Sequence, residues 1–415
     1  MDRPKLAEAV TARKSEEKIA PRSRDFYRAT AALFCGGFAT FSLLYSAQPL
    51  LPAFAREFGI SPATSSLVLS ATTGTLAFAL VFAGTLSDVL GRKRVMVFSL
   101  AAASATMLLA ALARDWRELV LLRALTGVAL SGLPAVAMAY LADEMAPNAI
   151  GLAMGLYIAG NTVGGLSGRL VGAVSADQGS WRAGFALVGA VSLASVALFA
   201  KSLPESRAFL PHKPDLGTLW KSLIGHFADP GLRLLFAIGF LVMGVFVTVY
   251  NYIGFRLQAP PFLLSQTQVG LVFGLYLVGG FSSAAMGELA TRFGRRRVLW
   301  IGMAIMLAGL LATLLDDLPA IIAGVGLVTI GFFGAHSVAS SWVGLRAETA
   351  KAQAASLYLL FYYLGSSVVG TLGGVFYQRA GWPGVAGLVG LLTVAGLAVA
   401  LMLARVGPPR WMAGR

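Results

Sequence analysis

The polar side chains that could do chemistry in this sequence are isolated residues inside long apolar stretches. Arg123 and Arg169 each lie in such a stretch, and so do the amides of Gln48, Asn161 and Asn251. A guanidinium removed from water requires a partner, and an amide offers both a donor and an acceptor. These residue types can bind a polar molecule or hold neighbouring helices together, so we expect them to face a polar cavity or one another.

The sequence lacks the residue patterns of an enzyme. Its three histidines are scattered, its single cysteine is Cys35, and it contains no nucleotide-binding loop or nucleophile elbow. We therefore expect no catalytic residue, no metal ion and no cofactor.

A proton-carrying residue is difficult to place, because no Asp or Glu lies deep inside an apolar stretch. His336 lies inside one, and an unperturbed histidine titrates near a pKa of about 6.5. Glu288 lies close to the end of another. We expect these two residues to be the candidates for a proton path. The alternative for His336, as for Gln48 and Asn251, is a simple hydrogen bond to a neighbouring helix.

The elements that must position these residues are membrane-spanning helices. Of the 415 residues, 57% are apolar and only 13% are charged, and the mean hydropathy is +0.74. Twelve apolar stretches follow one another from Ala29 to Leu403. Each has the roughly 18 to 25 residues that cross about 30 Å of hydrocarbon as a helix. Backbone groups in lipid must bond within their own segment, so we expect an all-α protein that spans the bilayer twelve times.

The net charge of +14 does not indicate a nucleic-acid partner, because its distribution follows the membrane. Most of the 33 Lys and Arg residues fall in segments that share one side of the predicted bilayer. Basic loops of this kind stay in the cytoplasm. We expect a bacterial inner-membrane protein with both termini in the cytoplasm.

The two embedded arginines are costly in lipid. Together Arg123 and Arg169 would cost about 5 to 7 kcal/mol at the middle of a bilayer. We expect each of them to face a wet cavity or a partner. The alternative is that each guanidinium reaches outward to the lipid headgroups.

The chain divides into two similar halves around a polar connector. We expect a cytoplasmic tail (1–28), a six-helix bundle (29–202), a cytoplasmic linker (203–230), a second six-helix bundle (231–404) and a tail (405–415). The halves match at ordered positions: Tyr157, Gly160, Val163, Gly165 and Gly168 correspond to Tyr362, Gly365, Val368, Gly370 and Gly373. A repeat of six helices gives a pseudo-two-fold axis along the membrane normal, with a solute held between the halves.

The segment Gly84–Arg94 resembles the Gly-x-Leu-x-Asp-x-x-Gly-Arg-Lys/Arg signature of the major facilitator superfamily, and Gly287–Arg297 is a second copy with Thr291 in place of the acid. The resemblance implies the fold of that superfamily and a conformational latch on the cytoplasmic side. The latch residues that it implies are Gly84, Asp88, Gly91, Arg92, Asp143, Glu144, Gly287, Gly294 and Arg295. The alternative is that Arg92, Lys93 and Arg94 only fix the topology.

Several shorter segments, among them Tyr45–Pro52 and Asn251–Arg256, resemble the bacterial acriflavine-sensitivity subfamily. The resemblance implies a secondary transporter for proton-coupled efflux of hydrophobic cationic compounds. We expect a monomer. The residues that we expect along the substrate and proton path are Gln48, Arg123, Asn161, Arg169, Asn251, Glu288 and His336. Two embedded arginines and no embedded acid would suit a small organic anion or a sugar-like solute better. A membrane receptor or scaffold without transport is a third hypothesis. The expected partners are the lipid bilayer, a small-molecule substrate and protons.

Overall fold

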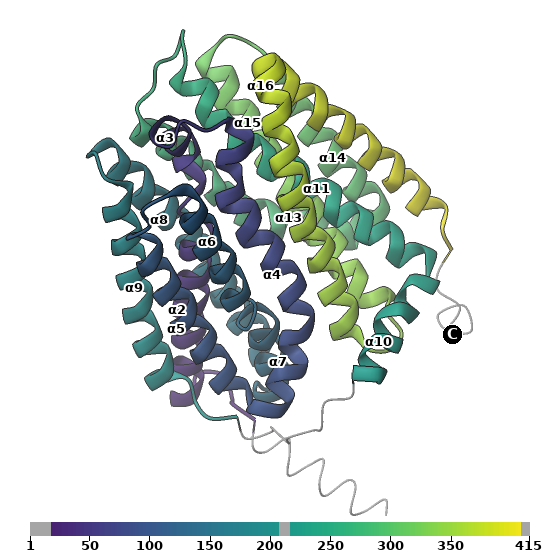
Figure 1. The fold of residues 1–415 in the computed structure, drawn as a ribbon. Coiled ribbons are helices and arrows are strands. Elements are labelled where there is room, and N and C mark those ends of the chain that lie inside the picture. The colour runs from purple at the N-terminus through teal and green to yellow at the C-terminus, as the bar shows by residue number, and fades with distance from the viewer. Residues whose placement is uncertain (1–17, 207–215, 408–415) are drawn as a thin grey trace, which may run out of the picture.

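The computed structural model describes residues 18–206 and 216–407, which form helices joined by short turns (Figure 1). In Figure 1 the purple-to-teal helices of the N-terminal half gather on the left and the green-to-yellow helices of the C-terminal half on the right. Parts of the expected tails and linker lie outside the described residues, namely 1–17, 207–215 and 408–415.

The N-terminal half contains α2 (Arg24–Tyr45), α3 (Leu51–Glu57), α4 (Pro62–Leu90), α5 (Arg92–Ala110), α6 (Trp116–Leu130), α7 (Pro134–Glu144), α8 (Pro147–Asp177) and α9 (Trp181–Ser202). The linker helix α10 (Leu216–Gly225) follows. The C-terminal half contains α11 (Pro230–Gln258), α12 (Gln266–Val272), the 3-10 helix η3 (Phe273–Leu277), α13 (Val278–Phe293), α14 (Arg295–Ala312), α15 (Leu318–Arg346) and α16 (Lys351–Arg405).

These elements make twelve membrane-length segments in the described part of the chain. Ten helices there are long and apolar enough to cross a bilayer. The 55-residue α16 is two helices joined at a kink, where Gly381 has a φ of 59°. The twelfth segment is α14, which is only 18 residues long and begins with three arginines. The predicted all-α fold with twelve spanning helices is confirmed.

Proline interrupts the first spanning segment. The helix α2 ends at Tyr45, a 3-10 turn covers Gln48–Leu50, and α3 begins with Pro52 in its first turn. Because Pro49 has no N–H group, it cannot continue the hydrogen bonding of α2. The break leaves backbone carbonyls at the end of α2 without helical partners.

Glycines bring equivalent helix pairs of the two halves into contact. A methyl group added at Gly160 of α8 would overlap the carbonyl oxygen of Phe34 in α2. In the other half, a methyl group at Gly365 of α16 would overlap the carbonyl oxygen of Phe240 in α11. The sequence pairs Gly160 with Gly365, so the repeat has the same packing role in both halves. Such small-residue stripes let two backbones touch.

The two ends of the bundle differ in charge. One end, here the basic end, carries the turns that contain Arg92–Arg94 and Arg295–Arg297. Lys93 pairs with Glu205 at 3.0 Å there, and Arg296 donates to the carbonyl of Val406 at 2.9 Å. The opposite end, here the far end, carries the Gln48–Leu50 turn, the end of α8 and the start of α12.

Candidate functional site

Arg169 lies where the two halves meet and is fully buried. The glycine stripe of α8 holds that helix against α2, which places Arg169 beside the Gln48 turn. Its Nε donates to Gln48 Oε1 at 2.8 Å, and its Nη1 donates to the carbonyl of Gly165 at 2.9 Å. Its Nη2 has no hydrogen-bond partner. One edge of a buried guanidinium is therefore available to an acceptor.

Two aromatic rings lie against this guanidinium. The Cζ atom of Arg169 lies 4.3 Å from the ring centre of Tyr45 and 4.7 Å from that of Tyr276. Tyr45 belongs to the N-terminal half and Tyr276 to the C-terminal half. Cation–π contacts of this kind stabilise the charge but do not satisfy an N–H group. The unpartnered Nη2 of Arg169 therefore still requires an acceptor.

A chain of side-chain hydrogen bonds continues from Arg169 across the seam between the halves. Gln48 Nε2 donates to Asn251 Oδ1 at 2.9 Å, and Asn251 Nδ2 has no partner. Arg169 can only donate, so Gln48 must turn its oxygen toward Arg169 and its nitrogen toward Asn251. This series of hydrogen bonds therefore ends on both sides in an N–H donor that has no partner. Sequence reasoning named these three residues, and the structure brings them together.

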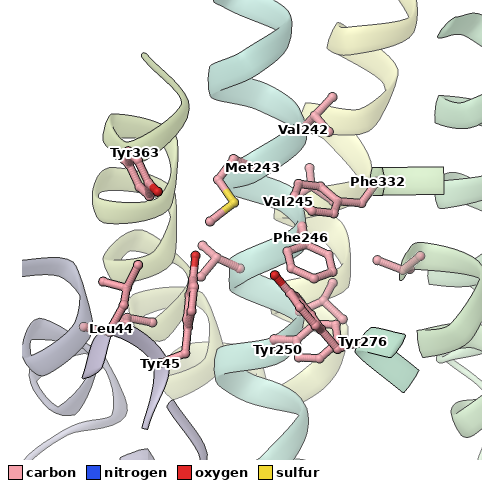
Figure 2. Close-up of a cluster of buried hydrophobic side chains, with 14 of the residues drawn as sticks. Leu44, Tyr45, Val242, Met243, Val245, Phe246, Tyr250, Tyr276, Phe332 and Tyr363 are labelled. Carbon is pink, nitrogen blue, oxygen red and sulfur yellow. The ribbon is translucent and has the colours of Figure 1, made fainter. Parts of the chain in front are cut away.

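Four aromatic side chains of the C-terminal half, here the aromatic group, lie next to Arg169: Phe246, Tyr250, Tyr276 and Phe332. Figure 2 shows Tyr45 facing Phe246, Tyr250, Tyr276 and Phe332 from the opposite half. The rings of Phe246 and Phe332 are stacked with centroids 3.8 Å apart. Together these rings offer a large apolar surface beside the charge.

His336 lies at the other side of this aromatic group. Its Nδ1 is 2.9 Å from the hydroxyl of Tyr358, and its ring centre is 4.7 Å from that of Tyr362. The side chain is partly exposed. It is the one predicted proton-path residue that the structure places beside the aromatic group.

Arg123 is also fully buried, but it has a different environment. Its Nη1 and Nη2 donate to the carbonyls of Leu43 and Leu44, each at 2.8 Å, and its Nε donates to the carbonyl of Val68 at 3.3 Å. These are the carbonyls that the break after α2 leaves available. Arg123 thus has the partner that the sequence predicted, and that partner is the backbone of α2 and α4.

Two other predicted path residues lie away from this group. Asn161 faces α2, where its Oδ1 would overlap a methyl group added at Gly37. Glu288 is exposed near the basic end and forms an ion pair with Arg292. The structure does not bring either residue to Arg169, and their roles in a path stay predictions.

The predicted latch residues lie at the basic end. Arg92 contacts Asp88 at 2.7 Å and Asp143 at 3.2 Å, and Gly91 before it has a φ of 96°. Glu144 contacts Ser206 instead. The second copy has the same turn, since Gly294 has a φ of 88°, and Arg295 begins α14 there. A methyl group at Gly84 or Gly287 would meet no atom within 4 Å, so close helix contact at these two glycines is not present in this conformation.

The seam is closed at the far end by residues that the sequence analysis did not single out. Asp177, at the end of α8, accepts hydrogen bonds from the backbone N–H groups of Gln266 at 2.9 Å and Thr267 at 2.6 Å. The Gln266 side chain also donates to the carbonyl of Pro49. A sequence signal for this region did exist, because Ser265 and Gln268 form a capping box at the start of α12.

No metal centre is indicated in the part of the chain that the structure describes, since no group of three or more His, Cys, Asp and Glu residues there could hold an ion.

Residues 33–260 and 254–413 match the family model described as Major Facilitator Superfamily. The chain belongs to this superfamily. It is 50% identical over 380 residues to the inner membrane transport protein YnfM of Escherichia coli (strain K12), covering 92% of this chain and 91% of YnfM. The resemblance inferred from the Gly84–Arg94 motif is thereby confirmed.

Two further similarities, one in sequence and one in fold, are to other transporters. The chain is 28% identical over 370 residues to the 3-(3-hydroxy-phenyl)propionate transporter of Escherichia coli (strain K12), covering 85% of this chain and 87% of that protein. Its fold matches a bacterial homologue of the human lysosomal transporter Spinster with a TM-score of 0.72, at 14% identity, covering 91% of this chain and 96% of that chain. The protein is a membrane transporter of small molecules and not an enzyme.

Proposed function

We propose that this transporter carries a small organic anion, which binds at Arg169 between the two halves and crosses the membrane by alternating access. The observation that supports this most directly is the unpartnered Nη2 of Arg169 in a fully buried residue. None of the ion pairs among the described residues includes Arg169. A buried guanidinium without a counter-ion favours an anionic ligand, because the ligand supplies the missing charge and acceptor.

The aromatic group supports an anion that also has an apolar part. The rings of Phe246 and Phe332 lie on the same side of the seam as Tyr276, which contacts Arg169. A ligand bound through a carboxylate could cover these rings with its apolar body. The related transporter named for 3-(3-hydroxy-phenyl)propionate, an aromatic carboxylate, agrees with this chemistry.

Proton-coupled efflux of hydrophobic cations is the second candidate, and one observation favours it. His336, Tyr358 and Tyr362 stand in mutual ring contact and present aromatic faces that can attract a cation. A cation roughly 5 Å from the Arg169 charge would be repelled by about 3 kcal/mol at an effective dielectric constant of about 20. That repulsion exceeds the usual gain from one cation–π contact, so an anion is the better-supported ligand of the site at Arg169.

The closed far end and the charge bias support the proposal of alternating access. We propose that the basic end is cytoplasmic, since basic loops remain inside. In this conformation Asp177 with Thr267, and Arg56 with Gln258 at 3.1 Å, join the halves at the far end, and Ser367 of α16 also donates to the Ser70 carbonyl of α4 at 2.8 Å. The site would then communicate with the cytoplasm, and separation of these contacts would expose it to the other side.

Binding measurements on purified protein test the substrate class. Hydrocinnamate, an aromatic carboxylate, should bind to the wild type, and the cationic analogue 3-phenylpropylammonium should not compete. Arg169→Met should weaken hydrocinnamate binding at least about 100-fold, because a charge-assisted hydrogen bond and the charge itself are lost. Arg114→Met, at an exposed arginine, should leave binding unchanged. Competition by the cation, with no binding of aromatic or aliphatic carboxylates, would overturn the proposal in favour of cation efflux.

A further inference from the structure

We infer that Gln48 determines the charge selectivity of this transporter: a neutral amide at position 48 keeps the site at Arg169 selective for anions. This inference rests on the proposed function and concerns the same site. Gln48 is 1% exposed and is the only side chain hydrogen-bonded to both Arg169 and Asn251 in the part of the chain that the structure describes. It acts through its two neighbours and is therefore a positioning residue.

The direction of the hydrogen bonds through Gln48 creates the two free donors. Arg169 uses Nε to reach the Gln48 oxygen, which leaves Nη2 without a partner. The Gln48 nitrogen takes the oxygen of Asn251, which leaves Asn251 Nδ2 without a partner. An amide at position 48 thus uses up one acceptor at Asn251 while it contributes only one acceptor to Arg169. The deficit of acceptors is what an anion would fill.

A carboxylate at position 48 would reverse this balance with almost no change in shape. Glutamate has two acceptor oxygens and no donor. One oxygen would remain at Arg169 Nε, and the pair of charges would cancel. The other oxygen would face Asn251, whose amide would turn its Nδ2 toward position 48. Asn251 Nδ2 would then have a partner, and the charge of Arg169 would be balanced without an external anion, although its Nη2 would still lack an acceptor.

The same residue also connects the two halves. Gln48 and Arg169 belong to the N-terminal half, and Asn251 belongs to α11 in the C-terminal half. A glycine lies beside each end of this series of hydrogen bonds, where a side chain would crowd the polar groups. A methyl group added at Gly165 would lie 3.2 Å from Arg169 Nη1, and one added at Gly370 would lie 3.3 Å from Asn251 Nδ2. Gly165 and Gly370 are equivalent positions of the repeat, so the two ends of the hydrogen-bond chain are built alike.

The experiment compares Gln48→Glu with Gln48→Met in the full-length purified protein. Hydrocinnamate and 3-phenylpropylammonium are titrated separately, and the ratio of their dissociation constants gives the charge selectivity. Gln48→Glu should weaken hydrocinnamate binding at least about 100-fold and bring the ratio to unity or reverse it. Gln48→Met retains the Arg169 charge, so it should weaken anion binding by about tenfold and keep the preference for the anion.

The outcomes separate this inference from the proposed function. Failure of the wild type to bind any organic anion would overturn the proposed function. Wild-type anion binding together with a Gln48→Glu variant that keeps its anion preference would overturn only the role of Gln48. An equal loss of preference in Gln48→Met would also overturn it, since the bridge and not its charge would then matter. If Gln48→Glu does not yield folded protein, Asn251→Asp applies the same test from the other end, and retained anion selectivity there contradicts the inference.

Discussion

The carboxylate of Asp177, at the last residue of α8, accepts the backbone N–H of Thr267 at the start of α12 with a distance of 2.6 Å. It also accepts the N–H of Gln266 at 2.9 Å. These N–H groups are the first of α12 and have no partner within their own helix. One carboxylate of the N-terminal half thus caps a helix of the C-terminal half, and the far end of the seam is held closed.

Removing this cap should open the far end. Hydrogen bonds to charged groups contribute about 1.5 to 3 kcal/mol each, and loss of one such contribution shifts a two-state equilibrium by roughly 10- to 100-fold. In a Cys35→Ser background, a cysteine placed at the buried Val269 should react faster with an impermeant maleimide when Asp177→Ala is added. Asp115→Ala removes a cap within the N-terminal half and serves as the control. Equal labelling rates in both variants would contradict the role of Asp177 in holding the far end closed.

Arg123 and Arg169 should respond differently to the same substitution. Arg123→Met leaves the carbonyls of Leu43 and Leu44 without their partner at 2.8 Å. Each buried unsatisfied group costs about 1 to 3 kcal/mol, so the thermal unfolding temperature in detergent should fall. The preference for anionic over cationic ligands should remain. A change of ligand preference in Arg123→Met with unchanged stability would show that Arg123 contacts the substrate.

The Arg92 cluster should affect transport rate more than stability. Its acidic partners Asp88 and Asp143 are 46% and 41% exposed, so each ion pair contributes less than about 1 kcal/mol. If the cluster is the predicted latch, Arg92→Gln should slow initial uptake into liposomes several-fold with little change in the unfolding temperature. Arg94→Gln is a suitable control, because Arg94 is exposed and carries the same charge in the same turn. Equal uptake by both variants would assign Arg92 to topology alone.

His336 is the residue that should carry the coupling proton if transport is proton-driven. Its ring lies 2.9 Å from the Tyr358 hydroxyl and is partly exposed. His336→Gln should abolish the pH dependence of uptake between about pH 5 and 8, because glutamine does not titrate there. His212→Gln, in the polar connector, is the control. Uptake by His336→Gln that keeps the wild-type pH profile would reject the assignment.

The docking of the linker should weaken in acid. Burial lowers the pKa of His226 below its usual value, although its hydrogen bond to the carbonyl of Ala350 at 3.2 Å acts in the opposite direction. The unfolded chain therefore binds more protons than the folded one, and stability falls as pH decreases below about 6.5 toward the lowered pKa. His226→Gln should lose less stability than the wild type between about pH 7 and 5 in thermal unfolding. Identical pH profiles would exclude this role.

The spanning helices were readable from the sequence because hydropathy and length alone set them. The short α14 and the kink of α16 at Gly381 did not obscure the count, since the repeat required six helices in each half. The break at Pro49 was visible as a proline, but its consequence was not. A proline indicates where a helix ends and says nothing about which distant side chain then takes up the free carbonyls.

Hydropathy, spacing and charge in the sequence indicate a twelve-helix membrane protein in two repeated halves, its superfamily motif, and the short set of polar residues that lipid would not tolerate alone. Only the tertiary structure decided which of these residues meet. Arg123 and Arg169 are the same residue type in neighbouring spans, yet one caps the broken α2 and the other keeps a free donor at the seam. The partners that separate them, such as Gln48 and Asn251, lie 203 residues apart. Hydropathy acts on each helix separately, whereas a binding site depends on how helices from both halves are rotated toward one another.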